Sequence, residues 1–291
     1  MTRPTHTVLV LGASGMLGNA AMRVFSEEPG YNVYGTVRNA ASIRHFPAPL
    51  QERLVAGVEA DSADHLLTAV ARFRPDTIVN CVGVIKQFEA SNDPLVALPL
   101  NAILPHRLAR LSQACGARLV HISTDCVFDG RRGGYREEDV ADATDLYGRS
   151  KLLGEVDYPN AITLRTSIVG HELNGNHALV DWFLSQEGSI NGFAKAVFSG
   201  LTTVELSRVI ARQVIPRADL RGLYHLSADP ISKHDLLSLV AEIYGKRIDI
   251  VRCEEPVIDR SLSSERFRAA TGYTPPDWRT LVRTLKEFYG R

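Results

Sequence analysis

The chain of 291 residues contains no long hydrophobic run. None of its apolar stretches approaches the ~20 consecutive residues that a helix needs to cross a bilayer. Arg3 and the apolar run Val8–Leu11 have the outline of a signal peptide, but the run is too short and glycines follow it directly. We therefore interpret this segment as a first β-strand, and we expect a cytoplasmic protein without a membrane partner.

The chain also lacks an excess of charge of either sign. It has 33 basic and 33 acidic residues, and its formal net charge at pH 7 is zero. A strongly basic surface is what attracts nucleic acids and anionic membranes. The charge balance therefore gives no support to nucleic acid as a partner.

Cysteine is scarce, and the four residues that occur form no CxxC pair: Cys81, Cys115, Cys126 and Cys253. Scattered cysteines are typical of buried thiols in a reducing compartment, not of a disulfide framework. The nine histidines show no spacing typical of a zinc site, so no metal ion is expected. The sequence also has no GxSxG elbow that would indicate hydrolysis.

Over its first 170 residues the chain alternates short apolar runs with helical patterns. At 45% hydrophobic residues it can bury a full core. Continuous Val/Ile/Leu runs are typical of strands that are buried on both faces of a parallel sheet. The runs lie at 7–12, 32–37, 54–57, 77–82, 118–123 and 161–168, and the helical patterns at 18–26, 62–73, 94–115 and 146–156. This order predicts a Rossmann-type, doubly wound α/β fold with right-handed crossovers.

Beyond about residue 170 the pattern loosens. Glycines and asparagines cluster between residues 174 and 192, and the later helical patterns lie at 204–215, 233–244 and 278–288. We predict two domains, 1–170 and 171–291. The second is a smaller, mixed α/β C-terminal lobe, and one strand near 222–228 could return from it to the main sheet.

A glycine-rich turn connects the first predicted strand to the first predicted helix. Glycine lets the backbone approach a pyrophosphate and lets the helix pack closely on the strand. The helix N-terminus offers free N–H groups and a partial positive charge to the same group. A glycine-rich stretch alone is also typical of a tight turn, but its place between strand and helix favours dinucleotide binding. The candidate contacts are Gly12, Ser14, Gly15, Met16 and Leu17.

The residue after the second predicted strand indicates which dinucleotide is bound. An acidic side chain here would hydrogen-bond the ribose 2′-hydroxyl of NAD. The chain has Arg38 instead, and a guanidinium suits a 2′-phosphate, which favours NADP(H). A solvated arginine at a strand end is the alternative. Asp61, after the third strand, could contact the adenine or cap the helix that starts near Ser62.

Tyr147 and Lys151 lie four residues apart, so their side chains share one face of a predicted helix. A free tyrosine titrates near pH ~10. A nearby ammonium favours the phenolate, so we expect Lys151 to lower the pKa of Tyr147. The pair is a candidate acid/base unit, although many helices contain it by chance.

Several motifs in register indicate a family. The glycine-rich turn is followed by NCVG (80–83), NAILPHRLA (101–109), STDCVFDG (123–130), YGRSKLLGE (147–155) and LRTS (164–167). This set resembles the extended short-chain dehydrogenase/reductases. Within them it is similar to the dTDP-4-dehydrorhamnose reductases, whose patterns include NxxxPxxLA, STDYVFDG and YGxSKxxGE. The resemblance is strong over about residues 7–170 and weak beyond them.

The resemblance implies roles for three residues. Tyr147 would donate a proton to a substrate carbonyl, and Thr124 would hydrogen-bond the carbonyl oxygen. Lys151 would hold the nicotinamide ribose and lower the pKa of the tyrosine. The first domain would then bind NADP(H) and the second lobe the substrate. The resemblance also implies cofactor contacts at the end of the fourth strand, from Cys81, Val82 and Gly83.

The chain departs from the family in two places. Cys126 stands where the reductases carry tyrosine and the related 4,6-dehydratases carry glutamate, which argues against dehydration. The family's RPxxSxL stretch is reduced to DRSL (259–262). Arg260 is a candidate ligand of a substrate diphosphate, with a surface role as the alternative. Lys86 and Asp125 are further candidates for substrate contact, although Asp125 could simply organise its turn.

These observations favour an NADPH-dependent reductase of a nucleotide-activated 4-keto-6-deoxy sugar, in polysaccharide or deoxysugar biosynthesis. A nucleotide-sugar epimerase or another carbonyl reductase would use the same residues, and net consumption of NADPH separates a reductase from an epimerase. A regulatory subunit that binds NADP without turnover is a third hypothesis, and the intact Thr124, Tyr147 and Lys151 weigh against it. Helices with apolar faces could support a homodimer.

Overall fold

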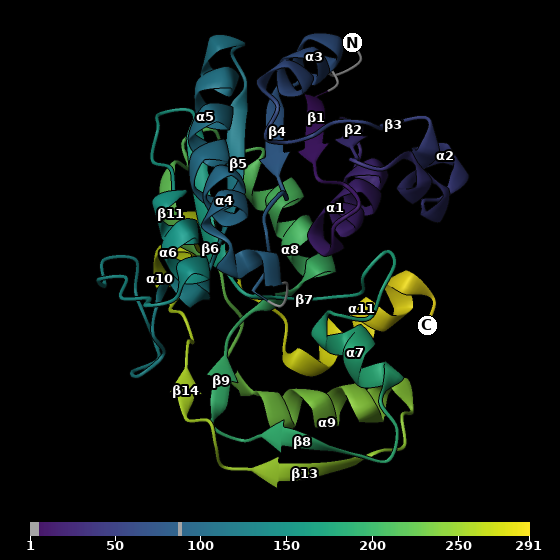
Figure 1. The fold of residues 1–291 in the computed structure, drawn as a ribbon, viewed down its shortest axis with the longest axis vertical. Coiled ribbons are helices and arrows are strands. Elements are labelled where there is room, and N and C mark those ends of the chain that lie inside the picture. The colour runs from purple at the N-terminus through teal and green to yellow at the C-terminus, as the bar shows by residue number, and fades with distance from the viewer. Residues whose placement is uncertain (1–5, 87–88) are drawn as a thin grey trace.

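The computed structural model describes residues 6–86 and 89–291. Within them, a sheet of parallel strands has the order β11-β6-β5-β4-β1-β2-β3. Its strands are β1 (His6–Leu11), β2 (Tyr31–Thr36), β3 (Leu54–Val55), β4 (Thr77–Asn80), β5 (Arg118–Thr124), β6 (Ala161–Thr166) and β11 (Gly222–His225). The predicted Rossmann-type α/β fold is confirmed (Figure 1).

Helices cover both faces of this sheet. One face packs on α1 (Met16–Glu27) and α8 (Thr203–Val209), and the other on α3 (Ala63–Phe73) and α5 (Leu104–Ala114). Successive side chains of β1 alternate between the two layers: Val8 and Val10 belong to the first core, and Leu9 and Leu11 to the second. Because both faces are buried, the strands are continuous apolar runs.

The remaining elements of the first half are short. They are η1 (Ala40–His45), α2 (Ala48–Gln51), η2 (Glu89–Asn92), α4 (Pro94–Ala97), η3 (Leu98–Ile103), η4 (Asp125–Val127) and α6 (Leu146–Leu153). The helix predicted over 94–115 is interrupted by η3, a π-helical segment. The helix predicted over 146–156 ends earlier, at Leu153. The next residue, Gly154, passes so close to η3 that a Cβ there would lie 1.9 Å from the carbonyl oxygen of Asn101.

The second half forms a smaller lobe that also contributes β11 and α8 to the larger one. Its strands are β7 (Ile168–Val169), β8 (Ser189–Phe193), β9 (Ala196–Phe198), β10 (Leu201–Thr202), β12 (Ile231–Ser232), β13 (Asp249–Cys253) and β14 (Ile258–Asp259). Its other helices are α7 (Leu179–Ser185), η5 (Ile210–Val214), α9 (Lys233–Tyr244), α10 (Glu265–Thr271) and α11 (Trp278–Tyr289). The run predicted as one strand over 161–168 is split, because β7 leaves the main sheet and pairs with β10.

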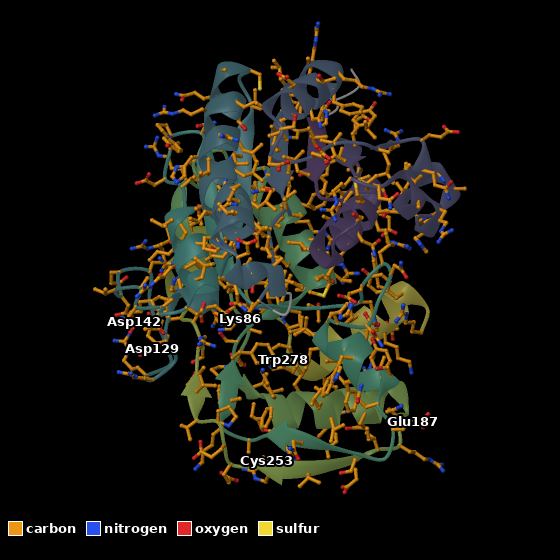
Figure 2. All side chains as sticks on the ribbon, in the orientation of Figure 1. Lys86, Asp129, Asp142, Glu187, Cys253 and Trp278 are labelled. Carbon is orange, nitrogen blue, oxygen red and sulfur yellow. The ribbon has the colours of Figure 1, made fainter. Side chains whose placement is uncertain are left out.

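Two side chains labelled in Figure 2 mark the interior of the smaller lobe and its junction with the main sheet. Trp278 lies inside the smaller lobe, where its ring contacts Phe198 and its Nε1 donates to the carbonyl oxygen of Asp229 at 2.7 Å. Lys86 lies at the junction of the two parts, at the end of the sheet that faces the smaller lobe (Figure 2). None of the helices in the described part of the chain is long and apolar enough to cross a bilayer.

The first prediction concerns the close packing of α1 on β1. A Cβ on Gly18 would lie 2.2 Å from the carbonyl oxygen of Gly12, so Gly18→Ala must displace backbone. We expect it to lower the free energy of unfolding by about 1–3 kcal/mol, measured by urea denaturation. Gly15→Ala is the matched control, since its Cβ would meet the same oxygen at 3.4 Å. Equal losses in the two variants would contradict this account of the packing.

Candidate active site

The glycine-rich turn after β1 runs close to the segment that follows β4. Gly12 has a φ of +76°, and a Cβ there would lie 2.9 Å from Val82 Cγ2 and 3.3 Å from the carbonyl carbon of Cys81. Gly15 is the N-cap of α1 and supplies no side-chain cap. The first N–H groups of α1 therefore need other partners, and a phosphate suits them. This geometry fits the dinucleotide site predicted at the turn.

The other predicted contacts of the turn differ in exposure. Ser14 and Met16 are half-buried, whereas the side chain of Leu17 is 5% exposed and belongs to the core under α1. Leu17 can therefore offer a dinucleotide only its backbone.

Arg38 follows β2 and Asp61 follows β3, the two outermost strands on one side of the main sheet. Arg38 is exposed two residues after the end of β2, and its guanidinium forms no ion pair with a described residue. A free guanidinium here fits the predicted 2′-phosphate contact. Asp61 is exposed and does not cap α3, because Ser62 does: its hydroxyl accepts from the amide of His65 at 3.3 Å.

Asn101 holds the segment after β4 in place. Its Oδ1 accepts from the amide of Val84 at 2.9 Å, and its Nδ2 donates to the hydroxyl of Ser150 on α6 at 3.2 Å. A Cβ on Gly83 would lie 3.1 Å from Asn101 Oδ1 and 3.9 Å from Lys151 Nζ. The segment that carries the predicted cofactor contacts therefore lies against the helix that carries the predicted acid/base pair.

Thr124, at the end of β5, lies beside Tyr147 on α6, and its hydroxyl acts to lower the pKa of that tyrosine. The threonine hydroxyl also donates to Asp125 Oδ1 at 3.0 Å and accepts from the amide of Cys126 at 3.1 Å. The two hydroxyls of the predicted catalytic set are thus adjacent. A carbonyl oxygen placed between them could accept from Tyr147 directly, and from Thr124 once that hydroxyl turns away from Asp125.

The predicted pKa shift of Tyr147 is wrong in direction. Burial raises the pKa of Tyr147 above its ordinary value, and the neighbouring Cys126 adds to the effect, while the hydroxyl of Thr124 opposes it. Lys151 Nζ donates instead to the carbonyl oxygen of Ile122 on β5, at 2.7 Å. The sequence spacing placed the two side chains on one helix but could not give the extent of their burial.

Lys151 itself is 6% exposed. Burial lowers the pKa of its ammonium to about 8, and the negative charge of Glu155 opposes this shift. The ammonium is therefore predominantly charged at neutral pH and loses its proton in mildly alkaline solution.

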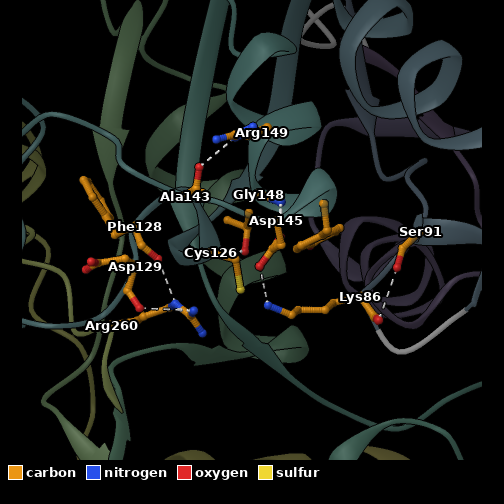
Figure 3. Close-up of polar contacts among 12 residues, drawn as sticks. Lys86, Ser91, Cys126, Phe128, Asp129, Ala143, Asp145, Gly148, Arg149 and Arg260 are labelled. Carbon is orange, nitrogen blue, oxygen red and sulfur yellow. Dashed lines mark hydrogen bonds and ion pairs between the residues drawn. The ribbon is translucent and has the colours of Figure 1, made fainter. Parts of the chain in front are cut away.

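Two cationic side chains lie on either side of Cys126 (Figure 3). Lys86 Nζ forms an ion pair with Asp145 Oδ2 at 2.7 Å, and Asp145 Oδ1 caps α6 by accepting from the amide of Gly148 at 2.7 Å. Arg260 donates its Nε to the carbonyl oxygen of Phe128 at 2.8 Å and its Nη2 to that of Asp129 at 3.3 Å. The structure thus brings these two predicted substrate contacts to the place where Thr124 and Tyr147 meet.

Cys126 and Asp125 are both perturbed by burial. Burial raises the pKa of the Cys126 thiol to about 12, so this side chain is a neutral thiol at physiological pH. Burial also raises the pKa of Asp125, while its hydrogen bond with Thr124 and the charge of Arg260 oppose the shift. A neutral thiol cannot take the role of the dehydratase glutamate as a base.

Sequence reasoning gave no role to several residues that organise this site. Asp145 stands directly before a predicted helix, and an aspartate in that position is a capping signal. Asn101 and Glu155 belong to quoted motifs, but their partners become evident only in three dimensions. Within the described residues, His, Cys, Asp and Glu side chains form no group of three or more that could hold a metal ion.

Residues 6–289 match the model of the protein family described as "RmlD substrate binding domain". The chain belongs to this family. The resemblance to dTDP-4-dehydrorhamnose reductases of the extended short-chain dehydrogenase/reductase type is therefore confirmed.

The chain is similar to curated proteins of two kinds, a reductase and a transferase subunit by name. The dTDP-4-dehydrorhamnose reductase of Aggregatibacter actinomycetemcomitans is 22% identical, over 97% of this chain and 98% of the relative. Methionine adenosyltransferase 2 subunit beta of Xenopus laevis is 32% identical, over 96% of this chain and 80% of the relative. With the Bos taurus subunit the identity is 34%, but the match covers 52% of this chain and less than half, 42%, of the relative.

Solved structures share the fold over the whole chain. A dTDP-4-dehydrorhamnose reductase from Clostridium acetobutylicum superposes with a TM-score of 0.80 at 20% identity, covering 98% of this chain and all of that one. A Bacillus anthracis dTDP-4-dehydrorhamnose reductase in complex with NADP gives 0.79 at 22% identity, covering 99% and all of that chain. At these identities the similarity shows the fold alone.

The second prediction tests the burial of Cys126. A thiolate is the reactive form of cysteine, so a half-buried thiol with a raised pKa should resist alkylation. At pH 8 we expect iodoacetamide to modify the exposed Cys115 rapidly and Cys126 and Cys81 slowly, because burial raises the pKa of Cys81 as well, to about 12. Peptide mass spectrometry gives the rates. Labelling of Cys126 as fast as that of Cys115 would mean that the thiol is exposed or ionised.

Proposed function

We propose that the protein is an NADPH-dependent reductase of a nucleotide-activated 4-keto-6-deoxy sugar. The observation that carries the proposal is the meeting of Thr124, Tyr147 and Lys151 beside the segment after β4. Membership of a family with a named dTDP-4-dehydrorhamnose reductase supports the substrate class. Polysaccharide or deoxysugar biosynthesis is the corresponding context.

The residues present fit a dinucleotide. The cradle at Gly12 would be filled by a Cβ, the uncapped N-terminus of α1 suits the pyrophosphate, and Arg38 suits the 2′-phosphate. Lys151 would hold the nicotinamide ribose hydroxyls. When bound, NADPH supplies the hydride for the reduction. The other proposed contacts of the dinucleotide, at the same end of the sheet, are Met16, Cys81, Val82, Gly83 and Asp61.

Tyr147 is the proposed general acid. Its raised pKa keeps the phenol protonated at neutral pH, so the hydroxyl has a proton to donate to the carbonyl oxygen. Thr124 would turn its hydroxyl from Asp125 to the same oxygen, donate a second hydrogen bond and stabilise the developing negative charge. The positive charge of Lys151 would favour the tyrosinate that remains after the transfer.

Lys86 and Arg260 are the proposed partners of the substrate diphosphate. They approach Cys126 from opposite sides, and the guanidinium is held by backbone carbonyl oxygens rather than by a carboxylate. A diphosphate can accept from both cations. Asp125 accepts a hydrogen bond from the hydroxyl of Thr124, so its proposed role is to hold that side chain at the end of β5 until a substrate carbonyl takes over the hydrogen bond.

A second candidate function is a regulatory subunit that binds NADP without turnover. The observation in its favour is that several relatives at 32–35% identity carry the name methionine adenosyltransferase 2 subunit beta. This hypothesis predicts binding of the dinucleotide together with the absence of carbonyl reduction.

The third prediction separates the two functions. In a single turnover with a dTDP-4-keto-6-deoxy sugar, we expect NADPH absorbance to fall for the wild type and about 10²–10⁴-fold more slowly for Tyr147→Phe, which loses the general acid. Tyr224→Phe, on β11, is the matched control and should keep the wild-type rate. Equal behaviour of wild type and Tyr147→Phe with every keto sugar tested would refute the reductase. Unchanged NADPH binding without turnover would support the regulatory subunit.

The fourth prediction tests cofactor choice. Charge-assisted hydrogen bonds are worth about 1.5–3 kcal/mol, so Arg38→Ala should weaken NADPH binding about 10–100-fold and leave NADH binding unchanged. Arg44→Ala, at an exposed arginine on η1, is the control. Fluorescence titration gives both dissociation constants. An equal loss for the two dinucleotides would show that Arg38 does not contact the 2′-phosphate.

A further inference from the structure

A buried carboxylate lies just beyond the C-terminal end of α6. Glu155 Oε1 accepts from the hydroxyl of Ser123 and from Arg165 Nε, each at 2.7 Å, and Glu155 Oε2 accepts from Arg165 Nη2, also at 2.7 Å. The side chains of Arg165 and Glu155 are 5% and 11% exposed. A buried pair of this kind costs desolvation free energy, so the fold alone gives it no clear advantage over apolar residues.

The other face of Arg165 is bound by a neutral group. Burial lowers the pKa of His225 to about 3, so the imidazole is uncharged; its Nδ1 lies 3.1 Å from the carbonyl oxygen of Tyr135 and its Nε2 lies 3.2 Å from Arg165 Nη1. The tautomer that satisfies both contacts has Nδ1 donating and Nε2 accepting. Within the described residues, Glu155 is therefore the one carboxylate that is ion-paired with Arg165.

Two contacts fix α6 to successive residues of β5. Lys151 donates to the carbonyl oxygen of Ile122, and Glu155 accepts from the side chain of the next residue, Ser123. The residue after these two is Thr124, where β5 ends. The ion pair with Arg165 extends the same connection to β6. If Glu155 were displaced, α6 would therefore shift relative to the end of β5, next to Thr124.

We propose that Glu155 is a positioning residue that fixes Lys151 against the end of β5. The inference rests on the proposed function, because it gives Lys151 and Thr124 their roles. It goes beyond that function in assigning the orientation and charge of the site to a pair of side chains that need not touch substrate or cofactor.

Other ionisable groups near Lys151 do not replace Glu155. On β5, burial lowers the pKa of His121 well below its ordinary range, so this imidazole is neutral. On η4, Cys126 is neutral and burial raises the pKa of Asp125. On α6 itself burial raises the pKa of Tyr147, so the phenol is neutral. Glu155 is the group whose charge raises the pKa of Lys151.

The fifth prediction measures Lys151 directly. The chain has six lysines, so ¹³C labelling at Cε gives few resonances, and Lys151→Arg assigns the relevant one. In the wild type we expect a midpoint near pH 8. Glu155→Gln keeps the shape but removes the charge and should lower the midpoint by about one pH unit or more, the usual effect of losing a nearby opposite charge. Glu155→Asp keeps the charge, so the midpoint of Lys151 in this variant should lie close to the wild-type value. An unchanged midpoint in Glu155→Gln would overturn the proposal.

Kinetics give a second measurement. Loss of charge should move the alkaline limb of the kcat profile to lower pH in Glu155→Gln, because Lys151 then deprotonates earlier, whereas general structural damage would reduce kcat equally at every pH. A profile that is lowered but not displaced would overturn the proposal. The titration needs no substrate, so the two proposals can fail separately. A midpoint that shifts in Glu155→Gln, in a protein that turns over no keto sugar, would refute only the reductase. Turnover together with an unshifted midpoint would refute only the role of Glu155.

Glu155→Gln could fail to fold, because it leaves Arg165 buried without a counter-charge. Ser123→Ala then supplies the test, since it removes one hydrogen bond and keeps the ion pair. The proposal expects the Lys151 resonance to move while those of Lys195 and Lys233, in the smaller lobe, stay in place. A Lys151 resonance that stays unchanged in this variant would also overturn it.

Discussion

The candidate site depends on how helix α6 is held against the end of strand β5. The helix has eight residues, too few to be stable by itself, so its position is set by its contacts. Lys151 binds the carbonyl oxygen of Ile122, and Asp145 caps the first turn. Because the end of β5 and the first turn of α6 are fixed together, the hydroxyls of Thr124 and Tyr147 meet. The chemistry proposed here follows from this junction.

Burial has opposite electrostatic consequences for the two members of the Tyr-x-x-x-Lys pair. It raises the pKa of Tyr147 and lowers that of Lys151, so it favours the uncharged form of each. For a proton donor the raised pKa is a cost, since a general acid works best with a pKa near the operating pH and a free tyrosine already keeps its proton at pH 7. For the lysine the lowered pKa is also a cost, and the opposing charge of Glu155 lies one helical turn beyond. The site thus combines a neutral acid with a retained cation.

The sequence predicted the main sheet well, because strands buried on both faces are continuous apolar runs such as 77–82 and 118–123. It did not predict the strands of the smaller lobe, which are short and partly exposed; β13, for example, has one apolar side chain turned inward, Ile250. It named Thr124 and Tyr147 through motifs, but the direction of the tyrosine shift depends on burial, which spacing does not encode. The division into two domains stays a prediction.

Strand β11 comes from the second half of the chain and pairs with β6 at the edge of the main sheet, residue 222 opposite 162. The smaller lobe is therefore built from two stretches of chain: the segment between β6 and β11, which carries β7 to β10 and α7, and the segment after β11, which carries β12 to β14, α9, α10 and α11. A fragment that stopped at residue 170 would leave the edge of β6 unpaired and one face of the sheet without α8. The first 170 residues therefore do not contain the complete sheet, since its edge strand and one of its covering helices come from the second half of the chain.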